Sequence, residues 1–173
     1  MPFSQLEIHL SRTEQKKAHE RLQDLAVMLA NLPKKHWKNL PASDYFLDEL
    51  TQLASITSFA AKNRQIKRVG KLMIDENRHA LVDVLFSSTF DNAQSAKITT
   101  WYKRLTLNDD NTLKQFVRQF KRAEHHTLSQ LLLWISYAKH HNDDELLTES
   151  QQDFETYIKE VCLLYTSDAA DER

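Results

Sequence analysis

The stretch AAKNRQIKRVGKLM, residues 60–73, combines helical spacing of apolar residues with five basic residues and no acidic one. We treat 59–78 as one helix and advance by about 100° for each residue. The positions on one side are then apolar, namely Phe59, Ile66, Val69 and Met73. The positions on the other side are basic, namely Arg64, Lys67, Arg68, Lys71 and Arg78. This separation predicts an amphipathic helix with a core-facing side and a cationic stripe.

The cationic stripe is the first indication of function. The stretch itself offers no acidic residue to pair with the basic ones, so their side chains repel one another along the helix. A solvated basic face is one interpretation, whereas a polyanionic partner gives a reason to keep the repulsion. Gly70, the single glycine of the chain, lies beside the apolar side. We expect close helix packing or a bend at this position.

The composition favours helices on both sides of this stretch. Of 173 residues, 41% are hydrophobic and 27% are charged, which is the balance of a globular protein. One glycine and three prolines are too few for a chain of hairpins, and they exclude a glycine-rich phosphate loop. The predicted fold class is therefore all-α, a multi-helix bundle.

Membrane and export signals are not expected from the sequence. The longest strongly apolar run, LLLWI at 131–135, is too short to cross a bilayer. The opening MPFSQLEIHL lacks the basic start and long apolar core of a signal peptide. We therefore expect a cytoplasmic protein.

Capping signals divide the first part of the chain. Ser11 begins a sequence that fits a capping box, and the residues after it show helical apolar spacing. Ser43 or Asp44 suits the start of a second helical pattern, which runs toward Arg78. We expect an N-terminal helical domain over 1–107 that includes the basic helix.

The second part of the chain is predicted to form a C-terminal three-helix bundle over 108–161. Asp91 or Ser95 begins the helix that precedes it, and Asn108 opens a turn and cap cluster. The three helices are expected near 111–122, 126–140 and 149–161. The helix at 126–140 is apolar nearly all round, so we expect it at the buried centre of the bundle.

The last residues, 162–173, do not continue the helical pattern. CLLYTSDAADE matches the peptide obtained by translating a common sequencing adapter, and we interpret the segment as a non-native tail joined near Val161. A natural disordered tail is the alternative. Without this segment Cys162 drops out, and with it disulfides, cysteine zinc sites and thiol catalysis.

A second cationic face is predicted on the helix at 111–122. Its basic side carries Lys114, Arg118, Lys121 and Arg122, and its opposite side is apolar. The segment 143–160 is acidic instead. The nearly neutral total charge thus hides two basic regions and an acidic one.

Chemistry of other kinds has little support. The adjacent pairs His125–His126 and His140–His141 diverge by about 100° on a helix, whereas zinc sites favour histidines four residues apart. We see no nucleophile beside a base. We therefore expect no metal, no cofactor and no enzymatic activity.

Four segments in this order resemble the DarP family, also called YjgA, of proteobacterial ribosome-associated proteins. They are SRTEQKKAHERLQDL at 11–25, LPASDYFLDELTQLASITSFAAKNRQIKRVGKLM at 40–73, WYKRLTLNDDNTLKQFV at 101–117 and the run to YIKEV at 157–161. The resemblance implies an all-helical protein that associates with the large ribosomal subunit late in assembly, binds 23S rRNA and is not an enzyme.

The resemblance also implies which residues contact RNA. Matching basic or polar positions are Lys16, Lys17, Lys62, Arg64, Gln65, Lys67, Lys71, Lys103, Arg104 and Arg122. Asn63 and Ile74 depart from the family pattern, which favours basic residues there. The mixed and then acidic stretch after Ile135 also departs from it.

We therefore expect a non-enzymatic, monomeric ribosome biogenesis factor that binds 23S rRNA and large-subunit (50S) precursors, with no membrane and no small-molecule substrate. A helical adaptor that places its basic face on an acidic protein is the alternative. The expected RNA-binding residues are Lys62, Arg64, Lys67, Arg68, Lys71, Arg78, Lys16, Lys17, Lys103, Arg104, Arg118, Lys121 and Arg122.

Overall fold

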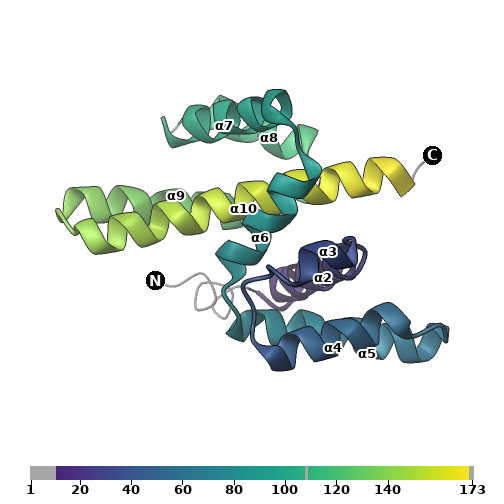
Figure 1. Ribbon diagram of the computed structural model, residues 1–173. Helices are drawn as coiled ribbons and strands as arrows, with labels where there is room; N and C mark the ends of the chain where they lie inside the picture. The colour runs from purple at the N-terminus through teal and green to yellow at the C-terminus, as the bar shows by residue number, and fades with distance from the viewer. Residues whose placement is uncertain (1–10, 108, 172–173) are drawn as a thin grey trace. The chain divides into compact units, whose positions relative to one another are not determined.

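Helices make up the regular structure of residues 11–107 and 109–171, which are the residues that the computed structural model describes (Figure 1). This part of the chain contains no strand, so the all-α prediction is confirmed. Residues 1–10, Asn108 and 172–173, which fall within the expected domains, lie outside the described residues.

The chain divides into two compact units between Leu85 and Phe86. Among the described residues, we call 11–85 the N-terminal unit and 86–171 the C-terminal unit. The boundary we expected at 107/108 differs from this one, because 92–106 packs with the C-terminal helices. Trp101 lies edge-on to Phe116, with ring centroids 5.4 Å apart. Aromatic packing of this kind assigns the helix to the C-terminal unit.

The N-terminal unit is built from α2 (Arg12–Ala30), the short α3 (Lys34–Trp37), α4 (Asp44–Ser55) and α5 (Phe59–Leu72). Ser11 caps α2 in a capping box with Glu14, and the Ser43 side chain caps α4, as the sequence predicts. Helix α5 packs beside both α2 and α4. The hydrophobic core of the N-terminal unit includes Leu22, Leu25, Leu29, Phe46, Leu50, Leu53, Val69 and Met73.

The single helix expected over 59–78 is interrupted. Helix α5 ends at Leu72, a 3-10 turn follows over Met73–Asp75 (η1), and α6 begins at Arg78 (Arg78–Thr89). The side chain of Asn77 accepts a hydrogen bond of 3.2 Å from the Ala80 backbone N–H, which is a capping interaction at the start of α6. Because the helix is interrupted here, the side-chain directions expected from one continuous helix do not apply to residues after α5.

The apolar side of α5 also differs from the prediction. Phe59, expected in the core, is 82% exposed because it is the first residue of the helix and extends beyond its packing partners. The buried residues of α5 are Gln65, Val69 and Gly70. The core-facing side therefore begins only one turn and a half into the helix.

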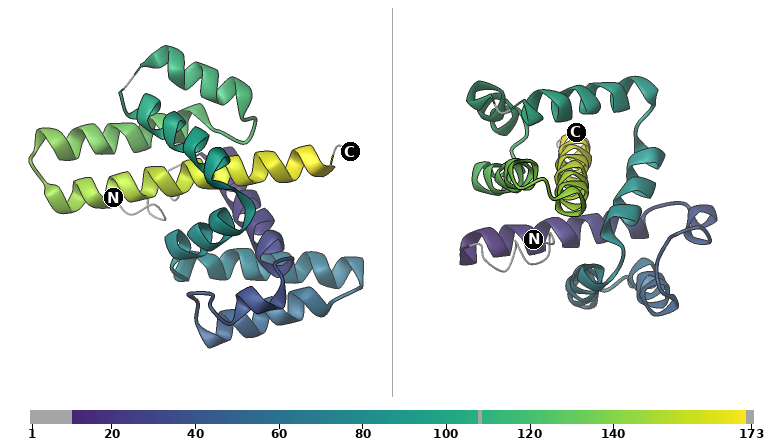
Figure 2. Two further views of the ribbon diagram at one scale, coloured as in Figure 1. Left: turned by 45° about the horizontal axis from the view of Figure 1, so that its top comes forward. Right: turned by 90° about the vertical axis from the view of Figure 1, so that its left-hand side faces the viewer.

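The C-terminal unit contains α7 (Asn92–Thr106), α8 (Asp110–Gln119), α9 (His125–His140) and α10 (Asp144–Asp171). Asp91 caps α7 as predicted, and Asp109 caps α8. Figure 2 shows α9 side by side with the first part of α10. Helix α9 is not buried throughout, because Leu133 is 60% and Tyr137 49% exposed.

Helix α10 is longer than the expected 149–161 and continues through the segment interpreted as a tail. Cys162, Leu163 and Leu164 are buried, and burial raises the pKa of the Cys162 thiol to about 12. The expectation that the helical pattern stops at Val161 is therefore wrong for the structure. The three consecutive apolar residues CLL at 162–164 indicate from the sequence that this segment can be buried. The adapter origin of the segment stays a prediction.

Candidate nucleic-acid interface

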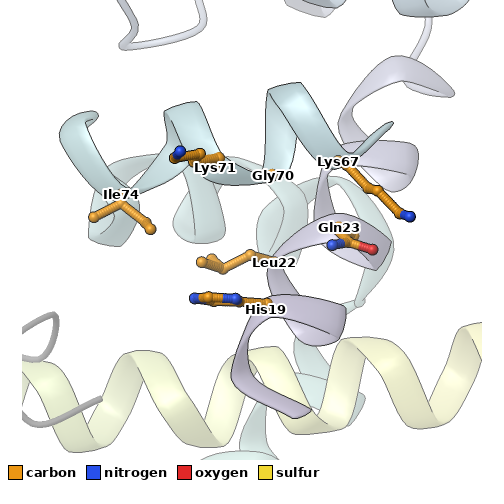
Figure 3. Close-up of a pocket in the computed structure, with 7 residues that line it drawn as sticks. All are labelled: His19, Leu22, Gln23, Lys67, Gly70, Lys71 and Ile74. Atoms are coloured by element: carbon orange, nitrogen blue, oxygen red, sulfur yellow. The ribbon is translucent and has the colours of Figure 1, made fainter. Parts of the chain in front are cut away.

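Helices α2 and α5 touch closely at Gly70, where a side chain would not fit. A Cβ atom at Gly70 would lie 2.9 Å from Cγ of Gln23 and 3.1 Å from both its Cα and its backbone nitrogen. The prediction of close helix packing at this glycine is thereby confirmed. A hollow of about 330 Å³ lies beside this close contact and is lined by residues of both helices. Figure 3 shows its lining residues, which are His19, Leu22, Gln23, Lys67, Gly70, Lys71 and Ile74.

A second hollow of about 490 Å³ adjoins the first along α2. The two share His19, Gln23 and Lys67. The remaining lining residues of the second hollow are Arg12, Gln15, Lys16 and Glu20. We refer to both hollows together as the α2–α5 groove.

The groove carries an excess of positive charge. Arg12, Lys16, Lys67 and Lys71 are exposed, and among the described residues none forms an ion pair with them. Glu20 is the one carboxylate among the lining residues. A concave surface with cations of one sign focuses a positive potential and attracts polyanions. The groove is therefore the part of the N-terminal unit best suited to bind phosphates.

Two further cations of the predicted set lie on α5 without lining the groove. Lys62 and Arg64 are exposed, and no described residue pairs with them. Lys17 is also exposed but interacts within the protein. These residues extend the positive surface beyond the groove along α5 and α2.

Arg68, a member of the predicted stripe, is engaged by α4 instead. Its Nε donates to Oε2 of Glu49 at 2.9 Å, and Nη2 donates to the Tyr45 hydroxyl. Gln65 donates to the same carboxylate oxygen at 2.7 Å. The hydrogen bond from Gln65, and then Arg68, lower the pKa of Glu49 below its ordinary value. Arg68 therefore serves to join α5 to α4.

Arg78 is likewise not part of an exposed stripe. It is 8% exposed, lies at the start of α6 and interacts within the protein. Its prediction as a surface cation is wrong because it depended on one continuous helix over 59–78. The stripe of α5 thus keeps three exposed members that form no ion pair with a described residue, Arg64, Lys67 and Lys71, whereas Arg68 is exposed but paired with Glu49.

The predicted cations of the C-terminal unit are more dispersed. Arg122 donates to both carboxylate oxygens of Asp168, at 3.0 and 3.2 Å. Arg104 lies over the Trp101 ring, 4.8 Å from its centroid, and donates to Gln115 at 3.1 Å. These two arginines are held by neighbouring side chains, which limits what they offer to a ligand.

The cationic face predicted over 111–122 does not form on one helix. Helix α8 ends at Gln119, and Lys121 lies in the turn that follows. Arg118 and Lys121 are exposed, as is Lys103 on α7. Lys103 lines a separate hollow of about 280 Å³ with Lys159 and Glu155.

The sequence prediction missed five polar residues of the groove, which are Arg12, Gln15, His19, Glu20 and Gln23. Arg12, His19 and Gln23 follow the same helical face as Lys16, since positions 12, 16, 19 and 23 are spaced by four, three and four. This spacing was available from the sequence and would have extended the predicted interface along α2.

The described residues contain neither a metal-binding cluster nor a membrane-spanning helix. Within 11–107 and 109–171, no group of three or more His, Cys, Asp or Glu side chains is arranged to hold a metal ion. None of the helices described has the length and apolar character needed to span a membrane.

Comparison with known proteins identifies the family. The family model for the dual-action ribosomal maturation protein DarP matches residues 8–159. The protein of that name from Methylobacillus flagellatus is 29% identical over 127 residues, 71% of this chain and 70% of its own length. The relative from Paraburkholderia xenovorans is 31% identical over 121 residues, and that from Cupriavidus metallidurans 29% over 123. These matches cover 66% and 67% of this chain, but only 59% and 60% of the two relatives. The family resemblance noted in the basic segment is confirmed, and the chain belongs to the DarP family of dual-action ribosomal maturation proteins.

Proposed function

We propose that the protein is a ribosome biogenesis factor that binds 23S rRNA on late precursors of the large (50S) subunit and assists their maturation. The observation that carries the proposal is the excess of positive charge in the α2–α5 groove. Its lining residues include the four cations Arg12, Lys16, Lys67 and Lys71 but one carboxylate, Glu20. The ribosomal part is supported by the family name, and the choice of 23S rRNA by the resemblance of the basic segment. It acts in the cytoplasm, as a monomer, by binding and not by catalysis.

The proposed mode of binding is neutralisation of phosphates by cations that the fold holds in place. Lysine ammonium groups are compact point charges, which contact phosphates without reading sequence. Lys62 and Arg64 extend the contact along α5, while Lys103, Arg118 and Lys121 give the C-terminal unit a weaker electrostatic contribution. Selection of the ribosomal site then depends on the shape of the RNA.

The experiment is sedimentation of tagged protein through a sucrose gradient of a cell lysate. The wild-type protein is expected with large-subunit precursors. The groove variant Lys16→Glu/Lys67→Glu/Lys71→Glu should remain at the top of the gradient, because each reversal replaces an attraction to phosphate by a repulsion. The matched control is Lys34→Glu/Lys35→Glu/Lys38→Glu, which makes the same charge change at exposed positions outside the groove.

The outcomes separate RNA from protein partners. Co-sedimentation of the groove variant with unchanged helicity would contradict the proposal, as would equal loss in the control variant. Nuclease treatment of the lysate before pull-down decides the alternative. Partners that survive complete RNA digestion would favour an adaptor that places the groove on an acidic protein.

A further inference from the structure

The α2–α5 groove differs in chemistry between its two ends. One end is lined by two apolar side chains. Leu22 is almost fully buried there, and Ile74 is 39% exposed. The other end is polar and cationic, with Arg12, Lys16 and Lys67 among its lining residues. In Figure 3, Ile74, Leu22 and His19 lie on one side of the hollow together with Lys71, and Gln23 and Lys67 lie on the other. Phosphate binding alone gives no reason for an apolar end.

The polar groups between the two ends are available to a ligand. The Gln23 amide, with a donor and an acceptor, makes no hydrogen bond to any residue described here. His19 is exposed and lines both hollows, so its flat ring lies where the two meet. Lys67 and Lys71 lie on either side of Gly70. A ligand here meets an apolar surface with Lys71 beside it, then the polar amide of Gln23, and then Lys67.

An unpaired nucleotide has these properties in the same order. Its base has apolar faces and polar edges, and it is joined through the ribose to phosphates that carry negative charge. The apolar hollow, at about 330 Å³, falls within the usual range of roughly 300–1,000 Å³ for small-molecule sites. A base inside a duplex is stacked and paired, so it cannot enter a groove between helices without first leaving the stack.

We propose that the apolar end of the α2–α5 groove receives one unpaired base of the bound RNA. The base lies against Ile74 and Leu22 with His19 beside it, and its polar edge faces Gln23. The adjoining phosphates lie at Lys67, Lys16 and Arg12. This inference rests on the proposed function, since it gives the RNA-binding groove a preference for single-stranded segments.

The test on the ligand side compares two probes with the same phosphates. One is a single-stranded RNA 12-mer without internal pairing, and the other is an abasic ribose–phosphate chain of equal length. The wild-type protein is expected to bind the 12-mer about tenfold more tightly, which corresponds to one stacked base. A blunt RNA duplex of 12 base pairs should show no such gain, because its bases remain stacked.

The test on the protein side uses two groove variants and one control. Ile74→Ser and His19→Ala are expected to reduce binding of the 12-mer by about five- to tenfold and to leave the abasic chain within twofold of wild type. Both positions are partly or largely exposed, so the fold should be retained, which a thermal melt verifies. Phe59→Ser is the matched control, because Phe59 is an exposed apolar residue of α5 outside the groove.

The result that overturns this inference differs from the one that overturns RNA binding itself. If wild type binds the 12-mer and the abasic chain equally, while Lys67→Gln weakens both, RNA binding stands and the base site is rejected. Equal loss of 12-mer binding in Phe59→Ser and Ile74→Ser also rejects the groove as its location. If wild type binds none of the three probes, the proposed function fails first.

Discussion

Each unit has a hollow between helices that is bordered by lysines, but the two hollows differ in charge. In the C-terminal unit, Lys159 is paired with Glu155 at 3.1 Å and lies over the Phe86 ring, 5.1 Å from its centroid. In the N-terminal unit, Lys67 and Lys71 border the α2–α5 groove, and no described residue forms an ion pair with them. Similar lysine content therefore produces one nearly neutral hollow and one cationic hollow.

Several arginines are used by the fold for its own contacts in both units, whereas Arg12, Arg64 and Arg118 are exposed. Arg68 joins α5 to α4, Arg122 holds Asp168, and Arg104 lies on Trp101. A planar guanidinium with five donors suits carboxylates and aromatic rings, whereas a lysine ammonium remains hydrated more readily. The cations available to a partner are thus mainly the lysines of α2 and α5. A count of charges along the chain does not show which cations are available to a partner, because it gives arginine and lysine the same weight.

The largest expected effect comes from shortening the C-terminal unit after Val161. This removes Leu163 and Leu164, which are fully buried, together with Asp168. Burial of each leucine contributes about 1.5–3 kcal/mol, so the loss is roughly 3–6 kcal/mol. We expect the melting temperature of the C-terminal unit to fall by more than about 10 °C, measured by circular dichroism.

A second truncation after Thr166 sharpens this result. It keeps the two leucines and Tyr165, which packs edge-on to Phe120 at 5.1 Å, but it removes Asp168 and releases Arg122. Its melting temperature should fall by only a few degrees, since partly exposed ion pairs contribute at most about 1 kcal/mol. If the longer deletion also leaves the melt unchanged, the segment after Val161 does not pack in solution.

The sequence predicts the elements of the fold better than their ends. Capping residues are local signals, so Ser11, Ser43 and Asp91 could be recognised directly. Whether a helix continues depends on packing, which the sequence does not display. Helix α10 continues past Val161, whereas the helical pattern toward Arg78, for which a bend was one alternative, is interrupted at Asp75-Glu76-Asn77, a stretch with the composition of a turn.

The site was predicted in part for a related physical reason. Helical periodicity places Lys67 and Lys71 on the surface, and the structure agrees. Periodicity cannot show that Glu49, nineteen positions before Arg68, captures that arginine, because this contact forms between helices. It also gives no indication of the groove, which depends on how closely Gly70 lets α2 approach.

The next effect concerns salt dependence and compares the basic residues of the two units directly. For Lys67→Gln/Lys71→Gln, the slope of log affinity against log salt should become shallower by about one to two units, because each phosphate contact contributes roughly 0.7–0.9. The matched variant Lys121→Gln/Arg122→Gln should change it by less than about half a unit, since Arg122 is held by Asp168. Fluorescence anisotropy on an rRNA fragment measures both. Equal changes in the two variants would remove the distinction between the units.

Gly70→Ala tests whether the groove depends on the close approach of its helices. The added Cβ meets the Gln23 backbone at 3.1 Å, so α2 and α5 must separate slightly. Overpacking costs about 1–3 kcal/mol, and alanine recovers up to about 1 kcal/mol in helix propensity. We expect a net loss of about 1 kcal/mol in unfolding free energy, measured by urea denaturation.

The variant Gly70→Ala/Gln23→Ala separates the two contacts at this position. It removes the flexible Cγ atom at 2.9 Å but leaves the backbone contact, so it should recover only part of the loss. An unchanged or higher stability of Gly70→Ala would show that the helices can part without cost, and that the glycine is not needed for the groove.

The smallest effect concerns Glu49, whose pairing distinguishes Arg68 from the free lysines on the same helix. Hydrogen bonds from Gln65 and then Arg68 hold the pKa of Glu49 below its ordinary value of 4.5. A carboxyl group with a lowered pKa in the folded state stabilises the protein above its ordinary pKa, and this contribution is lost as pH falls through the lowered value.

The melting temperature of wild type should therefore exceed that of Glu49→Gln by a few degrees at neutral pH, and the difference should shrink between about pH 5 and pH 3. Glu20→Gln is the control for the loss of one carboxylate, because Glu20 is exposed and no described residue pairs with it. A deficit of Glu49→Gln that persists undiminished at pH 3 would mean that Arg68 is not held by the ionised carboxylate. Arg68 would then belong with Lys67 and Lys71 as a cation available to RNA.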